Sequence, residues 1–218
     1  MDIQFYGANC VSVTYKGTRV VIDDNLAALG GKSVLKADDI ALYTTDQTDK
    51  PAAKLLIDHP GEYEVSDISI HGVAAQAHMD PASDAGGRVE ADNSKKQATM
   101  YKITAGDLNL LFTGHIYPDI SEAQLEEIGK VDVMFVPVGG NGYTLDAIGA
   151  LKLIKEVEPK LIIPTHYADK SLSYEVPQQD LPQALHELGM EPKETTGKLK
   201  LKSADLSDVM QLIVLEKS

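Results

Sequence analysis

The periodicity of the sequence changes after Pro118, and this change limits the folds open to the chain. Before it, short β-branched or apolar runs alternate with turn residues, which is typical of a meander of strands. After it, three helical patterns alternate with short apolar runs, and the first helix has Ser121 as its N-cap residue. Strands first and strand–helix alternation later predict an α/β fold of two packed sheets with helices outside.

The expected elements are short, and a long polar segment interrupts them. Residues 79–96 contain hardly any large apolar side chain, which indicates an exposed loop. Strands are expected at residues 3–6, 11–15, 19–22, 40–44, 54–57, 63–65, 68–73, 99–104, 108–112, 131–136, 161–163, 198–201 and 209–215, and helices at residues 121–128, 145–157 and 181–188.

Composition narrows the classes of function. The 218 residues suffice for one sizeable domain, expected to span residues 1–218. A net charge of -13 disfavours a nucleic-acid partner, because clustered Lys and Arg supply most of the affinity for phosphate. No apolar run approaches the ~20 residues of a membrane helix, so no membrane role is expected. Cys10 has no second cysteine to pair with, and the first residues lack a signal peptide, which predicts a cytoplasmic protein with a buried thiol.

Four segments, in this order, carry a resemblance to a known family. They are Phe-Tyr-Gly-Ala-Asn-Cys at 5–10 with Val-Val-Ile-Asp at 20–23, His-Pro-Gly-Glu-Tyr-Glu-Val at 59–65, Val-Asp-Val-Met-Phe-Val-Pro-Val-Gly-Gly at 131–140, and Ile-Ile-Pro-Thr-His-Tyr at 162–167. Together they resemble the metallo-β-lactamase superfamily, in particular its small bacterial Zn-dependent hydrolase-like branch, to which the ascorbate-phosphate lactonase-like proteins are related. The resemblance implies a four-layer αβ/βα sandwich.

The metal-binding loop of that family is largely changed in this sequence. Members carry Thr-His-x-His-x-Asp-His, and the corresponding residues here are 44–50. The resemblance places Thr45, Gln47 and Lys50 at the three histidine positions and keeps only Asp49. Neither Thr nor Gln is a good Zn²⁺ ligand, and an ammonium group at the third position opposes a metal cation. A dinuclear hydrolase centre is therefore not expected.

The ligands that the family places later in the chain are better kept. His166 matches the final histidine, His78 falls near an earlier one, and His115 stands where the family has an aspartate that bridges two metals. With Asp49, these three histidines could hold one divalent transition metal, Zn²⁺ first among them, if their side chains reach a common point. Alternatively the site is vestigial, with no cofactor, and His166 serves packing while Lys50 neutralises Asp49.

Two functions follow from these alternatives. The first is a non-catalytic protein that binds a small molecule or a protein partner in the former active site. Lys50, Tyr143 and Tyr167 would give that site a lining suited to an anionic small molecule, although tyrosines at such positions are as often core residues. The second is a mononuclear hydrolase of an ester, lactone or phosphodiester, with Asp49 as fourth ligand or general base. Self-association to a homo-oligomer is a further expectation, based only on the fold.

Overall fold

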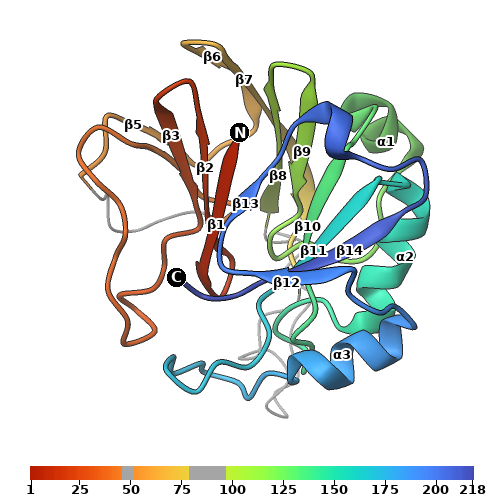
Figure 1. The fold of residues 1–218 in the computed structure, drawn as a ribbon. Helices are drawn as coiled ribbons and strands as arrows, with labels where there is room; N and C mark the ends of the chain where they lie inside the picture. Colours follow the sequence, from red (N-terminus) through yellow and green to blue (C-terminus); the bar gives the residue numbers. More distant parts are fainter. Residues whose placement is uncertain (46–51, 79–96) are drawn as a thin grey trace, which may run out of the picture.

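The computed structural model describes residues 1–45, 52–78 and 97–218, and two β-sheets dominate it (Figure 1). The six-stranded sheet has the order β13 (Leu199–Lys200), β1 (Asp2–Gly7), β2 (Cys10–Tyr15), β3 (Thr18–Ile22), β4 (Ile40–Leu42) and β5 (Leu55–Ile57). The eight-stranded sheet has the order β12 (Glu194–Thr196), β14 (Gln211–Leu215), β11 (Leu161–Thr165), β10 (Val133–Pro137), β9 (Leu108–Phe112), β8 (Gln97–Ala105), β7 (Ile68–Gln76) and β6 (Gly61–Val65).

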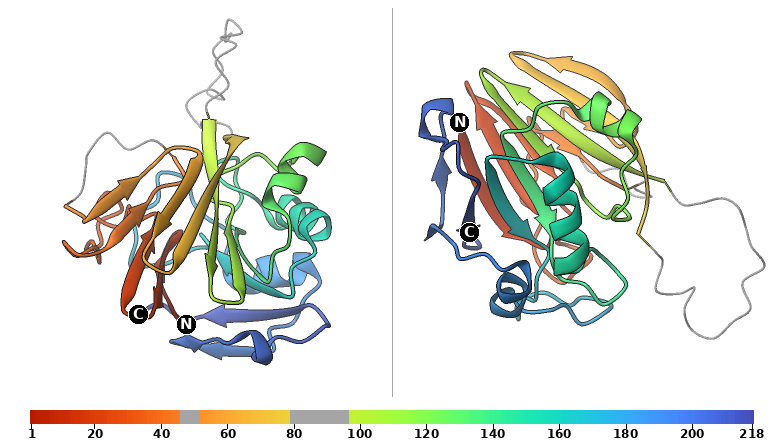
Figure 2. Two further views of the ribbon diagram at one scale, coloured as in Figure 1. Left: turned by 90° about the horizontal axis from the view of Figure 1, so that it is seen from above. Right: turned by 90° about the vertical axis from the view of Figure 1, so that its right-hand side faces the viewer.

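The helices α1 (Glu122–Ile128), α2 (Ala147–Val157) and α3 (Leu181–Leu188) cover the outer face of the eight-stranded sheet (Figure 2). Helix α2 begins two residues later than its apolar pattern suggests. The reason is Asp146, whose side chain accepts a hydrogen bond of 2.7 Å from the Gly149 amide and so caps the helix. Among the described residues, no helix is long and apolar enough to cross a membrane.

The predicted α/β sandwich is confirmed, and its main core lies between the two sheets. Aliphatic side chains from both sheets fill this layer, and the rings of Phe112 and Phe135 stack in it with centroids 4.2 Å apart. On the outer face of the six-stranded sheet, the loop residues Leu26 and Leu172 pack against the buried Cys10 of β2. The helical layer on that side is thus replaced by loop residues wherever the structure describes the chain.

Parallel pairing decides where the functional residues collect. In the eight-stranded sheet β10 pairs in parallel with both β9 and β11, with Phe135 opposite Phe112 and Pro137 opposite Thr165. In the other sheet β3 and β4 are parallel, with Ile22 opposite Leu42. The carboxyl ends of parallel strands meet at one edge, so residues that follow these five strands are brought together.

Strand β12 forms without a local sequence signal. β12 has the sequence Glu-Thr-Thr and is not predicted, because its residues are largely exposed and show no apolar alternation. It forms through parallel pairing with β14, in which Glu194 lies opposite Ile213. Tertiary pairing therefore sets this strand rather than local sequence preference.

Candidate functional site

His166 follows the last residue of β11 and lies in the left-handed region at φ 51°. Its amide donates to the Ala8 carbonyl at 2.8 Å, which joins the ends of β11 and β1. Its Nδ1 lies 3.1 Å from Gln178 Oε1, and the Gln178 amide nitrogen donates to the Val176 carbonyl at 2.7 Å. Because that bond fixes which end of Gln178 is the oxygen, Nδ1 of His166 donates the proton and Nε2 keeps a lone pair.

His115 lies beside His166 at the end of β9. The two rings meet edge to face with centroids 4.6 Å apart, and the ring of Tyr143 is 5.3 Å from that of His115. Burial is the main cause that lowers the pKa of His115 to about 3, with repulsion from His166 next, while a hydrogen bond to the Tyr143 backbone acts the other way. Burial likewise lowers the pKa of His166 to about 4. Both imidazoles are therefore neutral near pH 7.

His78 approaches His115 through its backbone but not as part of a metal-binding group. Its amide donates to the His115 carbonyl at 2.8 Å, while its ring Nδ1 lies 3.1 Å from the Gly142 carbonyl. Among the described residues, no group of three or more His, Cys, Asp or Glu side chains is placed to hold a metal ion. The expected three-histidine set is thus not assembled, and Asp49 and Lys50 lie outside the residues that the structure describes.

Asp23 and Thr44 form a buried contact between the ends of β3 and β4. The Asp23 carboxylate accepts 2.7 Å hydrogen bonds from both the amide and the hydroxyl of Thr44. Burial outweighs these bonds and raises the pKa of Asp23 to about 6. Gly114 leaves room for this contact, because a Cβ there would overlap the Thr44 side chain. The pair fixes the floor of the site where the two sheets approach.

These strand ends surround a cavity of about 500 Å³. Tyr143 lines it together with His115, His166 and Asp23. Several further lining residues were not anticipated from the sequence, because they lie in polar loops without a recognisable motif. The lining consists of Ala8, Asn9, Asp23, Asn25, Ala28, Leu29, His115, Tyr143, His166, Ser173, Tyr174 and Glu175.

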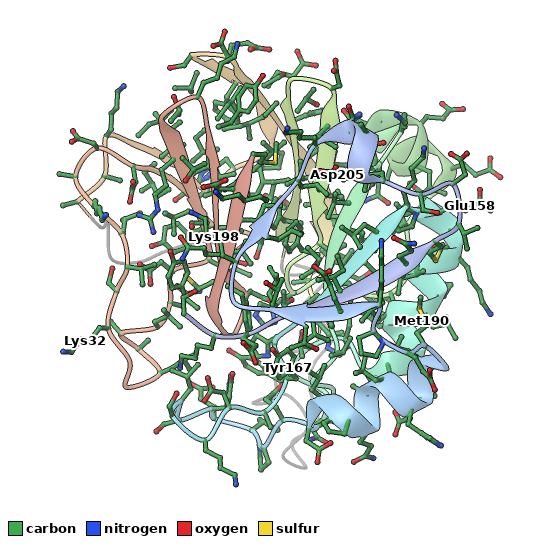
Figure 3. All side chains as sticks on the ribbon, viewed as in Figure 1. Lys32, Glu158, Tyr167, Met190, Lys198 and Asp205 are labelled. Carbon is green, nitrogen blue, oxygen red and sulfur yellow. The ribbon has the colours of Figure 1, made fainter. Side chains whose placement is uncertain are left out.

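Tyr167 lies elsewhere, although it directly follows His166. Its hydroxyl donates to the Leu215 carbonyl at 3.2 Å and its ring packs 5.7 Å from that of Phe5. Tyr167 is labelled in Figure 3. It lines a different cavity, next to Asp169 and Lys217. The prediction that Tyr167 lines the same site as His166 is therefore wrong, because its side chain packs against β1 and β14 and does not face the histidine pair.

Comparison with known proteins agrees with this architecture. The family profile described as "Beta-lactamase superfamily domain" matches residues 2–166. The chain belongs to this superfamily. A "UPF0173 metal-dependent hydrolase" of Carboxydothermus hydrogenoformans is 39% identical over 67 residues, which are 31% of this chain and 29% of that protein. The match thus spans less than a third of that relative.

Solved structures show the same fold in this superfamily. A candidate Zn-dependent hydrolase from Thermotoga maritima aligns with a TM-score of 0.74 and 21% identity over 98% of this chain and 97% of its own. A candidate metal-dependent hydrolase from Parabacteroides distasonis aligns with a TM-score of 0.64 and 16% identity over 99% and 93%. At these identities the likeness concerns the fold, and the chemistry has to be argued from the site.

The superfamily suggests a divalent metal, and the described donors can be tested against that expectation. A bridging carboxylate offers one oxygen to each of two ions, whereas His115, which stands at that position by resemblance, offers a single lone pair because its other nitrogen is engaged with the backbone. The described residues therefore do not fit a dinuclear centre. Two adjacent imidazoles alone also fall short of the three protein ligands that a catalytic Zn²⁺ site has.

Proposed function

We propose that this superfamily member binds a small molecule in the histidine-lined cavity and does not carry out dinuclear metal hydrolysis. The observation that supports this most directly is the pair of neutral imidazoles, His115 and His166, which meet edge to face where hydrolases of this fold would hold metal. Both rings lie next to the ring of Tyr143, and all three residues line the cavity. The arrangement is suited to contact an organic ligand.

The loss of loop ligands supports the same proposal. By resemblance, Thr45 stands at the first histidine position, and a neutral hydroxyl binds Zn²⁺ poorly. Thr44 donates two hydrogen bonds to Asp23, so a contact within the protein fixes the chain after β4. The cavity volume of about 500 Å³ is within the range of small-molecule sites, roughly 300 to 1,000 Å³.

A mononuclear hydrolase is the second candidate, and one observation favours it. His78 and His166 each use Nδ1 in a hydrogen bond to an oxygen acceptor, which leaves Nε2 of both rings free to bind a ligand. Metal-bound histidines usually have such a partner on the second nitrogen. A mononuclear site would also need His115 and Asp49, and the described side chains form no group of three metal ligands in this structure.

Hydrolysis assays separate the two candidates. Nitrophenyl acetate, a lactone and bis-nitrophenyl phosphate would each be incubated with the protein in EDTA and, separately, after addition of Zn²⁺ or Mn²⁺. We expect the wild-type protein to show no more metal-dependent turnover than the His166→Asn variant. Asparagine is chosen because it tolerates the left-handed backbone conformation of residue 166. A metal-dependent rate that disappears in both His166→Asn and His115→Ala would overturn the proposal and support the mononuclear hydrolase.

A further inference from the structure

Four aromatic rings meet around the cavity. His166 is in contact with three of them, with centroid distances of 4.6 Å to His115, 5.3 Å to Tyr174 and 5.9 Å to Tyr143. His115 and Tyr143 also meet edge to face at 5.3 Å. All four residues are among those that line the cavity, so a ligand there would lie next to several aromatic rings.

The aromatic side chains are held by bonds of their own. The Tyr174 hydroxyl donates to the Tyr167 carbonyl at 3.1 Å, which ties the loop after β11 to the strand end. His166 is fixed through Gln178, as its Nδ1 donates to the side-chain oxygen at 3.1 Å. A preorganised set of rings loses little side-chain freedom when a ligand binds.

Charge in the lining is negative. Two carboxylates, Asp23 at the floor and Glu175 at the exposed rim, contribute to the wall of the cavity. The lining residues that the structure describes include no Lys or Arg, and the whole chain carries a net charge of -13. The field in the cavity therefore favours a cation over an anion.

Aromatic rings combined with carboxylates are the arrangement that recognises alkylated ammonium ions, because the ring faces carry negative charge density and tolerate the methyl groups of the cation. We propose that the cavity binds a small organic cation with an alkylated ammonium group, enclosed by His115, Tyr143, His166 and Tyr174. This inference rests on the proposed ligand-binding function and names the class of its ligand. It differs from the anionic ligand that Lys50 suggested in the sequence.

Choline and its uncharged isostere 3,3-dimethylbutan-1-ol test the role of the positive charge. Both would be titrated against the full chain in EDTA, with binding measured by ligand-observed NMR. We expect choline to bind and the isostere to bind roughly tenfold more weakly or not at all. Equal binding of the two molecules, or binding of neither, would overturn the inference.

Variants at Tyr143 test the rings themselves. Tyr143→Leu is expected to weaken choline binding roughly tenfold, while Tyr143→Phe, which keeps the ring, should restore most of the affinity. Equal losses in both variants would contradict a contact with the ring face. Because the choline titration is made in EDTA, its failure is distinguishable from failure of the proposed function, which would instead be detected as metal-dependent hydrolysis.

Discussion

Acidification from about pH 7.5 to about pH 4.5 is expected to lower the free energy of unfolding by roughly 3 kcal/mol through groups at the site. The folded-state pKa values of His115 and His166, about 3 and about 4, lie below the usual 6.5. The unfolded chain therefore binds more protons below pH 6.5, and the stability from the neutral imidazoles is lost as the pH falls. Asp23 acts in the opposite direction, since its folded pKa of about 6 is above 3.8.

Urea unfolding at the two pH values measures this change in the free energy of unfolding. Its size follows from the pKa shifts, because a pKa difference of one corresponds to about 1.4 kcal/mol. The net loss is about 3 kcal/mol because Asp23 offsets part of the histidine effect and because His115 is partly exposed. The His166→Asn variant should lose clearly less stability on acidification than the wild type. His186→Asn, on the exposed side of α3, is the matched control and should follow the wild-type profile. Parallel profiles for all three proteins would show that His166 is not buried in a neutral state.

Replacement of Gly139 by alanine is expected to destabilise the protein by roughly 3 kcal/mol or more. Gly139 follows β10, and a Cβ at this position would overlap the His166 carbonyl oxygen and the Gln178 side-chain oxygen. Either β11 or the 178 segment would have to move, and both hold the His166 ring. The substitution should therefore weaken ligand binding as well as stability.

Gly197→Ala is the matched control for that substitution. Gly197 is exposed, and the nearest atom to an added Cβ is a Glu216 carboxylate oxygen at 4.0 Å. Its free energy of unfolding should change by about 0.5 kcal/mol at most, which is usual for a surface position. If Gly139→Ala were as stable as Gly197→Ala in urea unfolding, the close approach of these segments would be refuted.

The sequence predicts much of the fold, because the strands beside the site are continuous apolar runs. Leu108–Phe112 and Leu181–Leu188 coincide with their expected ranges. β10 differs from its expected range by two residues at its start and one at its end, and β11 by two at its end. The spacing of apolar residues and the helix-capping residues are local features of the sequence, and they are sufficient to predict these elements. By contrast, the polar β12 depends on pairing with a strand later in the chain, which no local pattern shows.

The candidate site was only partly predictable from sequence. His115, His166 and Tyr143 follow strand ends or a glycine turn, positions at which a resemblance to known motifs could be seen. Tyr174 and Glu175 come from a polar loop after β11 that reaches the cavity only through tertiary contacts. Tyr167 was predicted at the site and lies elsewhere, because a residue next to His166 in the sequence can point its side chain in another direction.

Metal content after loading is the most direct test of the account. The purified chain would be exposed briefly to Zn²⁺, Mn²⁺ or Fe²⁺, desalted and subjected to elemental analysis beside His115→Ala. We predict far less than one metal ion per chain in both proteins, because the described donors do not form a group that holds metal. About one ion per chain that is lost in His115→Ala would contradict the ligand-binding account and establish a mononuclear site.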